Sequence, residues 1–490
     1  MPTNDYISET KEVLKQFICF IEDSPWKDDY LVRLQQLLAN MDAPCRLAIA
    51  GRVKAGKSSL VNALLGINLA KVGETETTAT INIFKSGTPP DSNKPVLCQY
   101  CDGHEEWVTK EFLDSLQGTS PEGLKKASEI KNLTYFVSDN KMLKNIILID
   151  TPGTNALVRE HEKQTELYFE LRQRHNEETI DISNKADAVI YLVEEVPKKF
   201  NQDFLSSLKA TMGQKSNVNT IVVMSQMDLH NRIYNKEKYA EDTYQGLSFY
   251  ISKVIPISAG IKLFLPSKEE AIRMKSVLLS IFDSEEDFEF GMKGGSETFK
   301  LLSLSNVQLS VEEQKSLVGE MPWPVFVVIA RELYKHDVDT ALAKLEDYSG
   351  IDCLKTTIEK YFFERSDIIR CNTIISDVYH TILLYLDFKL KNTQDTLIKN
   401  RYAPIRAKIV AIKEKTDRIN QDFDCLQKLN YNRDKFSIEE IEELTKLFAY
   451  NTTAQRDESR CAHWQSKYVD SMRKDQHDIV TRAYQKYCEL

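Results

Sequence analysis

The stretch Cys45-Arg-Leu-Ala-Ile-Ala-Gly-Arg-Val-Lys-Ala-Gly-Lys-Ser-Ser-Leu60 decides the fold, because an apolar run leads directly into a glycine-rich turn and an amphipathic segment. Gly51 to Ser58 fits the pattern G-x-x-x-x-G-K-S/T at every fixed position. Such a loop wraps a phosphate with backbone N–H groups, and the positive end of the next helix faces the anion. We expect Lys57 to reach the β- and γ-phosphates and Ser58 to hold Mg²⁺. The other loop positions placed against the nucleotide are Gly51, Val53, Lys54, Ala55, Gly56 and Ser59.

Length and composition describe a multi-domain globular protein. At about 150 residues per domain, 490 residues predict two to four units. The apolar fraction of 42% and the charged fraction of 28% are ordinary for globular proteins, and no apolar run approaches the roughly 18 residues of a spanning helix. The first residues lack a basic region followed by an apolar core, so no signal peptide is expected. A net charge of −9 argues against a nucleic-acid partner. We therefore expect a cytoplasmic protein.

The nine cysteines are scattered without a repeated spacing. This usage predicts reduced thiols rather than a disulfide framework. Cys98 and Cys101, with His104 three residues on, form the one metal-like arrangement. It lacks a second cysteine pair, so two thiols on a strand and its turn are favoured over a zinc site.

The order of elements along the chain predicts an α/β domain between helical segments. Residues 7–20 and 26–41 have helical periodicity, with Ser24-Pro25 between them. From Cys45 to about Ala259, strands and helices alternate as in a doubly wound, mostly parallel sheet. The expected strands are Leu47–Ala50, Thr80–Phe84, Pro95–Tyr100, Leu133–Val137, Ile146–Ile149, Ala188–Val193, Thr220–Met224 and Lys253–Ile257, and Thr109–Leu116 is an expected helix.

The remainder of the chain is mainly helical in pattern. Glu269–Phe282 is an expected helix, and Gly291–Glu297 is an expected loop because of its glycine and serine. From Gly350 onward long apolar periodicities predict a helical bundle. We interpret one apolar stripe as bundle core, with a lipid-binding face as the alternative. The stripe consists of Ile369, Ile375, Val378, Ile382, Leu386 and Leu390.

A second motif belongs at the phosphate end of the site. Ile146 to Gly153 reads as a buried strand that ends in Asp150 and is followed by a Pro-Gly turn. Asp150 can reach Mg²⁺ through water, and the Gly153 N–H can bind the γ-phosphate. In the polar segment before Thr80, Thr78 is our candidate to bind Mg²⁺ and orient the attacking water. Thr77 is the alternative, because a run of threonines leaves the register open.

Base selection is expected after the strand Thr220–Met224. Asp228 follows that strand, and its carboxylate can accept from both N1–H and the exocyclic amine of guanine, whereas adenine has no N1–H. Ser225 and Gln226 precede it in the same segment. Ser258-Ala259, after the last strand, would bring a backbone N–H and a small hydroxyl to the base edge.

These motifs together resemble the dynamin superfamily of large GTPases, in particular bacterial dynamin-like proteins. The resemblance lies in Gly51–Gly66, the Thr-Thr-Ala-Thr segment, Asp150-Thr-Pro-Gly153, the long insertion between them, and Ser349-Gly350-Ile351 leading into Leu354. It implies a GTPase domain with a separate all-α bundle or stalk built from N- and C-terminal helices. The implied units are 1–44, 45–365 and 366–490. It also implies GTP-dependent pairing of GTPase domains and membrane remodelling.

The sequence departs from the family pattern at two places. Members usually have Asn or Thr, then Lys, before the guanine-reading aspartate, where this chain has Ser225-Gln226. Gln is shorter and uncharged, so it covers the base less well than a lysine stem. Dynamins carry Gln and Ser where this chain has Val53 and Lys54. Our hypothesis is that the Lys54 ammonium stands near the leaving β–γ oxygen, where dynamins place a monovalent cation.

The sequence therefore predicts an enzyme that hydrolyses GTP to GDP and phosphate with Mg²⁺. Its expected partners are a second copy bound through the GTPase domain and either a membrane, as a peripheral protein, or a partner dynamin-like protein. Two alternatives stay open. One is a ribosome- or RNA-linked assembly GTPase, which would be expected to append a basic RNA module. The other is a nearly inactive nucleotide-dependent scaffold, which the Ser225-Gln226 segment favours.

Overall fold

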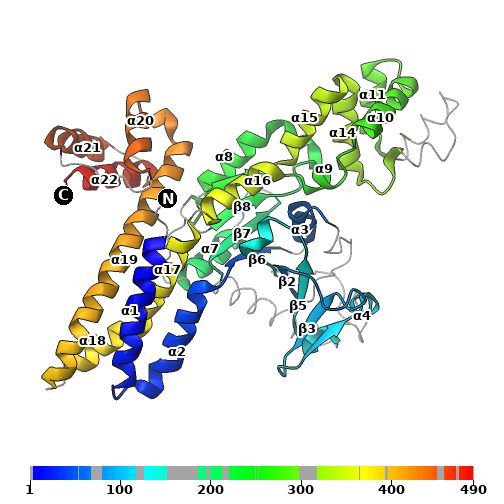
Figure 1. The fold of residues 1–490 in the computed structure, drawn as a ribbon. Helices are drawn as coiled ribbons and strands as arrows, with labels where there is room; N and C mark the ends of the chain where they lie inside the picture. Colours follow the sequence, from blue (N-terminus) through cyan, green and yellow to red (C-terminus); the bar gives the residue numbers. More distant parts are fainter. Residues whose placement is uncertain are drawn as a thin grey trace.

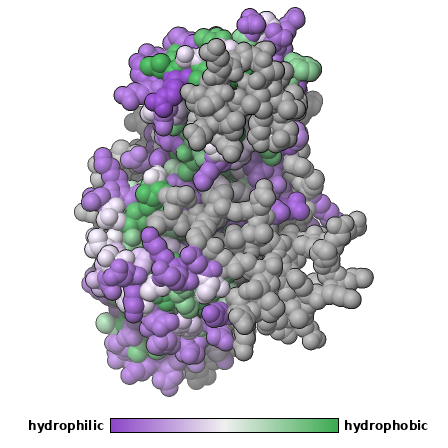
Figure 2. Space-filling view, turned by 90° about the vertical axis from the view of Figure 1, so that its right-hand side faces the viewer, coloured by the Kyte–Doolittle hydropathy of each residue, from purple (hydrophilic) through white to green (hydrophobic). Residues whose placement is uncertain are grey.

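The structure, a computed structural model, places a central sheet between a long helical stalk and a smaller helical lobe (Figure 1). On the face drawn in Figure 2, hydrophilic side chains predominate among the coloured residues and hydrophobic ones occur in small groups. Among the residues that the structure describes, no helix is both long enough and apolar enough to cross a bilayer. The described residues are 4–52, 54–67, 80–116, 126–151, 186–194, 199–211, 220–248, 250–251, 253–296, 299, 317–363, 365–391, 395–449, 457–470 and 474–488.

The described part of the chain forms a nine-stranded sheet in the order β4-β3-β5-β2-β6-β1-β7-β8-β9. Strands β6, β1, β7, β8 and β9 are parallel to one another, and β2 is parallel to β5. Strand β2 runs antiparallel to β6, and β3 runs antiparallel to β4 and β5. The mostly parallel α/β sheet expected from the sequence is confirmed. The strands are β1 Cys45–Gly51, β2 Ile81–Ser86, β3 Val96–Tyr100, β4 Glu105–Val108, β5 Ile130–Val137, β6 Ile146–Asp150, β7 Ala188–Val193, β8 Thr220–Met224 and β9 Lys253–Pro256.

Helices cover both faces of the sheet because its central strands are apolar on both sides. Successive strand residues point to opposite faces, so Leu47 and Ile49 of β1 belong to one buried cluster, while Ala48 and Ala50 belong to another. Helix α3 packs in the first cluster and α8 in the second. The helices around the sheet are α3 Lys57–Leu65, α4 Lys110–Ser115, α7 Lys199–Thr211 and α8 Lys236–Leu247, with short 3₁₀ segments at Met142–Lys144 and Leu229–Asn235.

The helical lobe follows the last strand. Ser267 and Glu270 form a capping box that starts α10. The expected loop at Gly291–Glu297 is wrong in its first part, because α11 continues to Lys293 with Met292 buried in the lobe core. The lobe helices are α9 Ala259–Leu263, α10 Lys268–Ile281, α11 Glu285–Lys293, α14 Trp323–Lys335 and α15 Val338–Ser349.

The stalk combines helices from both ends of the sequence, as expected. Helix α1 packs on α17 and α19, and α2 lies against α1 (Figure 1). All six residues of the apolar stripe are buried, so the bundle-core interpretation is confirmed and the lipid-face alternative is wrong. The stalk helices are α1 Asn4–Glu22, α2 Lys27–Ala39, α17 Ser366–Val378, α18 Leu384–Lys391 and α19 Thr396–Tyr431, with a 3₁₀ turn at Asn40–Asp42 and a π-helical segment at Tyr379–Leu383. Helix α16 Ile351–Ile358 and a π-helical segment at Glu359–Phe363 connect the lobe to the stalk. The unit boundaries at 44/45 and 365/366 stay a proposal.

The C-terminal helices form a small cap at the upper end of α19 (Figure 1). Helices α21 and α22 pack side by side as a hairpin, which brings the first turn of one to the last turn of the other. Cys461 and Cys488 are joined there in a disulfide, with 5.9 Å between their Cα atoms, so the expectation of reduced thiols is wrong for this pair. Because a contact between two helix ends leaves no repeated cysteine spacing, the sequence did not indicate it. The helices are α20 Ile438–Leu447, α21 Glu458–Asp470 and α22 Lys474–Cys488, after a 3₁₀ turn at Arg433–Lys435.

Candidate nucleotide site

The glycine-rich loop joins β1 to α3 at the carboxyl end of the sheet. Gly56 has a φ of 85° and precedes the first residue of α3, a left-handed conformation that residues with a Cβ rarely adopt. The first N–H groups of a helix have no partner within the helix, and no side chain of the described residues caps α3. These N–H groups can therefore bind an anion. Ser58 and Ser59 lie half-buried in this first turn.

Lys57 and Asp150 are buried beside each other under the loop. The Lys57 ammonium donates to the carbonyl oxygens of Gly51, at 3.3 Å, and Arg52, at 3.0 Å. Burial lowers the pKa of Lys57, against the attraction of Asp150 and Glu194. Burial has the opposite effect on the acid: it raises the pKa of Asp150 to about 6, although the charge of Lys57 and the nearby amide of Asn82 act to lower it.

The Asp150 carboxylate fits a group that receives a metal-bound water. It ends β6 opposite Ile49 of β1, so it lies at the same sheet edge as the glycine-rich loop. The Asn82 amide lies nearby, but neither buried oxygen receives a hydrogen bond of normal length and angle from the described residues. An ionised carboxylate only accepts hydrogen bonds, and oxygen ligands and water are what Mg²⁺ prefers. The unpartnered oxygens therefore suit a donor that comes with the ligand.

The residues that depart from the family pattern hold the loop from the side of β8. The Ser225 hydroxyl donates to the Ala55 carbonyl at 2.6 Å. The Gln226 side-chain amide donates to the Lys54 carbonyl at 2.8 Å. Lys54 is exposed, and both it and Gln226 have positive φ angles, of 66° and 57°. Non-glycine residues in this conformation cluster at functional sites.

Asp228 and Ser258 meet where β8 and β9 end. The Ser258 hydroxyl donates to a carboxylate oxygen of Asp228. The same hydroxyl accepts from the Ile261 N–H at 3.2 Å and so caps α9, which begins at the buried Ala259. The Ser258 N–H donates to the Ser349 carbonyl at 3.0 Å, which ties this corner to the end of α15. One side of Asp228 is thereby fixed, and its orientation depends on Ser258.

The structure brings most of the predicted residues to one edge of the sheet. Lys57 lies with Asp150, Ser225 and Gln226 lie on the loop, and Asp228 lies with Ser258. Four other predicted positions, Val53, Thr77, Thr78 and Gly153, fall outside the described residues.

Sequence reasoning missed the residues that hold the segment after Asp228. Arg331 of α14 is buried and contacts Asn231, and Arg232 donates to the Glu194 carbonyl. The available signal was a charged pair, Arg331-Glu332, inside an otherwise apolar helical run, since such charges are rarely buried without a partner.

Comparison with known proteins finds matches to parts of this chain. The model of the Dynamin family matches residues 47–227. Dynamin-like protein 2 of Campylobacter jejuni is 26% identical over 260 residues, 51% of this chain and 36% of that protein. Isoniazid-induced protein IniC of Mycobacterium tuberculosis is 41% identical over 64 residues, 13% of each chain. These matches therefore span well under half of either relative's length.

Solved structures also align along the chain. One described as "An oligomerised bacterial dynamin pair provides a mechanism for the long range sensing and tethering of membranes" covers 97% of this chain and 89% of its own, with 15% identity and a TM-score of 0.34.

Proposed function

This chain belongs to the dynamin superfamily, and from that premise we propose a Mg²⁺-dependent GTPase that pairs through its GTPase domain and acts on a membrane as a peripheral protein. A dynamin-family GTPase domain implies GTP hydrolysis and a divalent metal in general terms. The residues that carry the chemistry, and the coupling to a membrane, are our proposal.

One observation supports the nucleotide half of this proposal: residues from three separate strand ends lie at the same edge of the sheet as the glycine-rich loop. Asp150 from β6 approaches Lys57, Ser225 from β8 holds Ala55, and Ser258 from β9 holds the base-reading Asp228. Ligands of doubly wound sheets bind at this edge. An ordinary Gly-rich turn would require none of these contacts.

Each residue has a distinct task at the phosphates. Lys57 would exchange its carbonyl partners for the β- and γ-phosphate oxygens, and Gly56 lets the α3 N–H groups face them. Ser58, Thr78 and, through water, Asp150 would hold Mg²⁺, with Thr77 as the alternative to Thr78. When bound, Mg²⁺ neutralises charge on the phosphates. Gly153 would sense the γ-phosphate.

Base recognition depends on Asp228. Its carboxylate would accept from N1–H and the 2-amino group of guanine, while the Ser258 hydroxyl keeps it oriented. The Gln226 amide donates to the Lys54 carbonyl, so the base-binding segment is still bonded to the glycine-rich loop although the family's lysine is absent. We therefore propose that guanine selectivity is retained with reduced affinity.

Titration with fluorescent GTP, GDP and ATP, each with Mg²⁺ and with EDTA, tests this half. We expect GTP and GDP to bind and ATP not to bind, and EDTA to weaken GTP most. Lys57→Ala should weaken GTP at least tenfold, since it removes a charged phosphate contact. Equal affinity for ATP and GTP would contradict the proposal. Tight GTP binding without turnover would favour the nucleotide-dependent scaffold.

Lys54 is our candidate for stabilising charge on the leaving oxygen. It is exposed at the rim of the loop, with its carbonyl held by Gln226. We expect Lys54→Ala to lower hydrolysis at saturating GTP, because a positive charge at the leaving group stabilises the transition state. A rate equal to that of the parent would exclude this role.

The membrane half of the proposal rests on membership of the superfamily. Co-sedimentation with liposomes, with and without a non-hydrolysable GTP analogue, tests it. We expect the analogue to increase binding. Binding to RNA but not to liposomes would favour the RNA-linked alternative instead.

A further inference from the structure

The segment that follows Asp228 is conformationally unusual. Leu229–Asn235 forms a kinked pair of short helical turns, in which His230 and Asn231 have φ angles of 55° and 58°. Two adjacent non-glycine residues in the left-handed region are uncommon and persist only where the surroundings hold them. Because this base-reading loop begins at the residue after Asp228, whatever holds it also positions Asp228.

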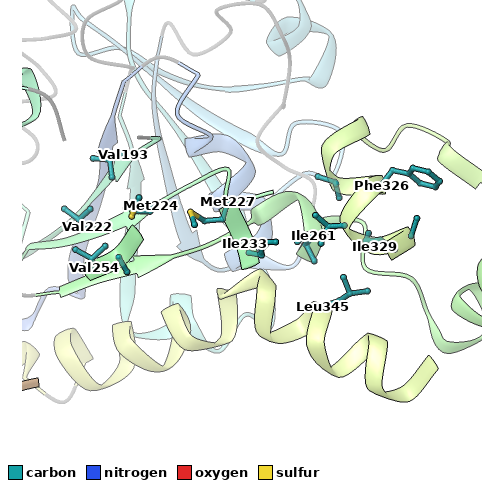
Figure 3. Close-up of a cluster of buried hydrophobic side chains, with 14 of the residues drawn as sticks. Val193, Val222, Met224, Met227, Ile233, Val254, Ile261, Phe326, Ile329 and Leu345 are labelled. Atoms are coloured by element: carbon teal, nitrogen blue, oxygen red, sulfur yellow. The ribbon is translucent and has the colours of Figure 1, made fainter. Parts of the chain in front are cut away.

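The lobe holds the base-reading loop from its apolar side. Met227 and Ile233, on either side of Asp228, are both buried in the cluster that contains Phe326 and Ile329 of α14. In Figure 3, Ile233 lies between Met227 and Ile261, and Ile329 follows beyond Ile261. This packing is non-directional, so it supports the loop but does not select one backbone conformation.

A directional contact comes from Arg331, which lies two residues beyond Ile329 in α14. One terminal nitrogen of its guanidinium donates to the Asn231 side-chain oxygen at 2.8 Å and lies 3.5 Å from the Tyr234 hydroxyl. The guanidinium also stands over the Tyr234 ring, 5.6 Å from its centroid. Arg331 thus grips the base-reading loop at a left-handed residue and again three residues later.

The other edge of the Arg331 guanidinium is anchored in the lobe. Its Nε and second terminal nitrogen both donate to the Glu289 carboxylate of α11, each at 2.9 Å. Although burial acts to raise it, these bonds and the charge of Arg331 hold the pKa of Glu289 below its ordinary value. A bidentate pair of this kind fixes orientation as well as charge, and Arg331 is only 8% exposed.

We propose that Arg331 is a positioning residue for guanine recognition, which holds the base-reading loop through Asn231 so that Asp228 faces the base. The helical lobe would then be part of the specificity apparatus of the GTPase domain. This inference rests on the proposed function, because it assumes that Asp228 reads guanine. Of the two partners, Asn231 is the better one to alter, since the Arg331–Glu289 pair then stays intact.

The test compares GTP with ITP, which lacks the 2-amino group that Asp228 would accept from. Asn231→Gly removes the side-chain acceptor and tolerates the left-handed backbone, so folding is preserved. We expect the parent to prefer GTP over ITP roughly tenfold, the value of one charge-assisted hydrogen bond, and Asn231→Gly to lower this ratio to about two. Asn231→Asp keeps an oxygen for Arg331 and should restore the ratio.

Arg331→Lys should lower the same ratio, because an ammonium cannot bond Glu289 and Asn231 in one plane. Lys335→Ala is the matched control: Lys335 lies one turn along α14 and pairs with Glu285 and Glu289 on α11, so the ratio should stay at the parent value. If the parent discriminates and Asn231→Gly keeps the full ratio, Arg331 has no positioning role. If the parent binds GTP and ITP equally, the assignment of Asp228 itself is wrong.

Discussion

Asp150 makes the nucleotide-free protein sensitive to pH. Its pKa is raised from 3.8 to about 6 by burial. Because the folded-state pKa lies above the unfolded one, the neutral carboxyl stabilises the fold below pH 3.8, and this stability is lost as the pH rises through about 6. At pH 8 the buried charge therefore costs on the order of 3 kcal/mol of unfolding free energy. The ionised Asp150 carboxylate therefore lowers the stability of the fold, and it provides a hydrogen-bond acceptor for the metal-bound water that we propose.

We predict that Asp150→Asn stabilises the nucleotide-free protein at pH 8 by roughly 1–3 kcal/mol and that this gain shrinks as the pH falls toward 4. Denaturant unfolding at several pH values measures it. Mg²⁺ with GTP should stabilise the parent more than the variant. Asp434→Asn, at an exposed carboxylate in the C-terminal cap, is the control and should change little. A variant less stable than the parent at pH 8 would contradict the assignment.

The residues of a single motif could be predicted from the sequence, whereas contacts between motifs could not. The spacing of Gly51, Gly56 and Lys57 is local, so the pattern alone indicates a phosphate loop. The bond from Ser225 to Ala55 joins positions 170 residues apart and depends on β8 lying near β1. From the sequence, Ser225-Gln226 indicates only that the family's lysine is missing. In the structure, both side chains hold the glycine-rich loop.

At the scale of elements, periodicity predicted the helices and strands, but it did not predict how the turns between them pack. Gly350 is an example. Gly350 ends α15 and begins α16 with a φ of 66°. A Cβ there would lie 2.4 Å from the Pro256 carbonyl oxygen and 3.1 Å from the Ile257 side chain. The turn between the lobe and the stalk connector thus rests directly on the end of β9, beside Ser258.

We predict that Gly350→Ala destabilises the protein by roughly 2–4 kcal/mol, because it adds left-handed strain and a backbone clash. It should also weaken GTP binding, since the clash displaces the strand end that carries Ser258. Gly103→Ala separates the two effects: Gly103 has a φ of 92° but nothing within 4 Å of the added Cβ. It should cost only about 1 kcal/mol and leave GTP affinity unchanged. Equal effects of the two substitutions would contradict this account.

At the scale of the whole molecule, the stalk contacts the nucleotide domain at the edge strand β9 of the sheet. Strand β9 is the last in the sheet order, and Tyr431 at the end of α19 bonds its Val254 through both backbone groups, at 3.0 and 3.4 Å. The Tyr431 ring also stacks on Tyr244 of α8, with centroids 3.7 Å apart. One stalk side chain therefore covers an edge that would otherwise be open to pairing.

This contact predicts how stalk and site communicate. Tyr431→Phe keeps the ring stacking and removes the two bonds to Val254, so it should cost about 1 kcal/mol and speed hydrogen exchange of the Val254 amide. Tyr431→Ala removes both interactions and should cost roughly 3–5 kcal/mol, with faster exchange along the whole of β9. Tyr385→Phe, at an exposed tyrosine on α18, is the control. Exchange at Val254 equal in Tyr431→Phe and the parent would show that the stalk does not hold this edge. If β9 does loosen, its end at Ser258 loosens with it, and GTP affinity should fall in Tyr431→Ala although the residue touches no part of the nucleotide site.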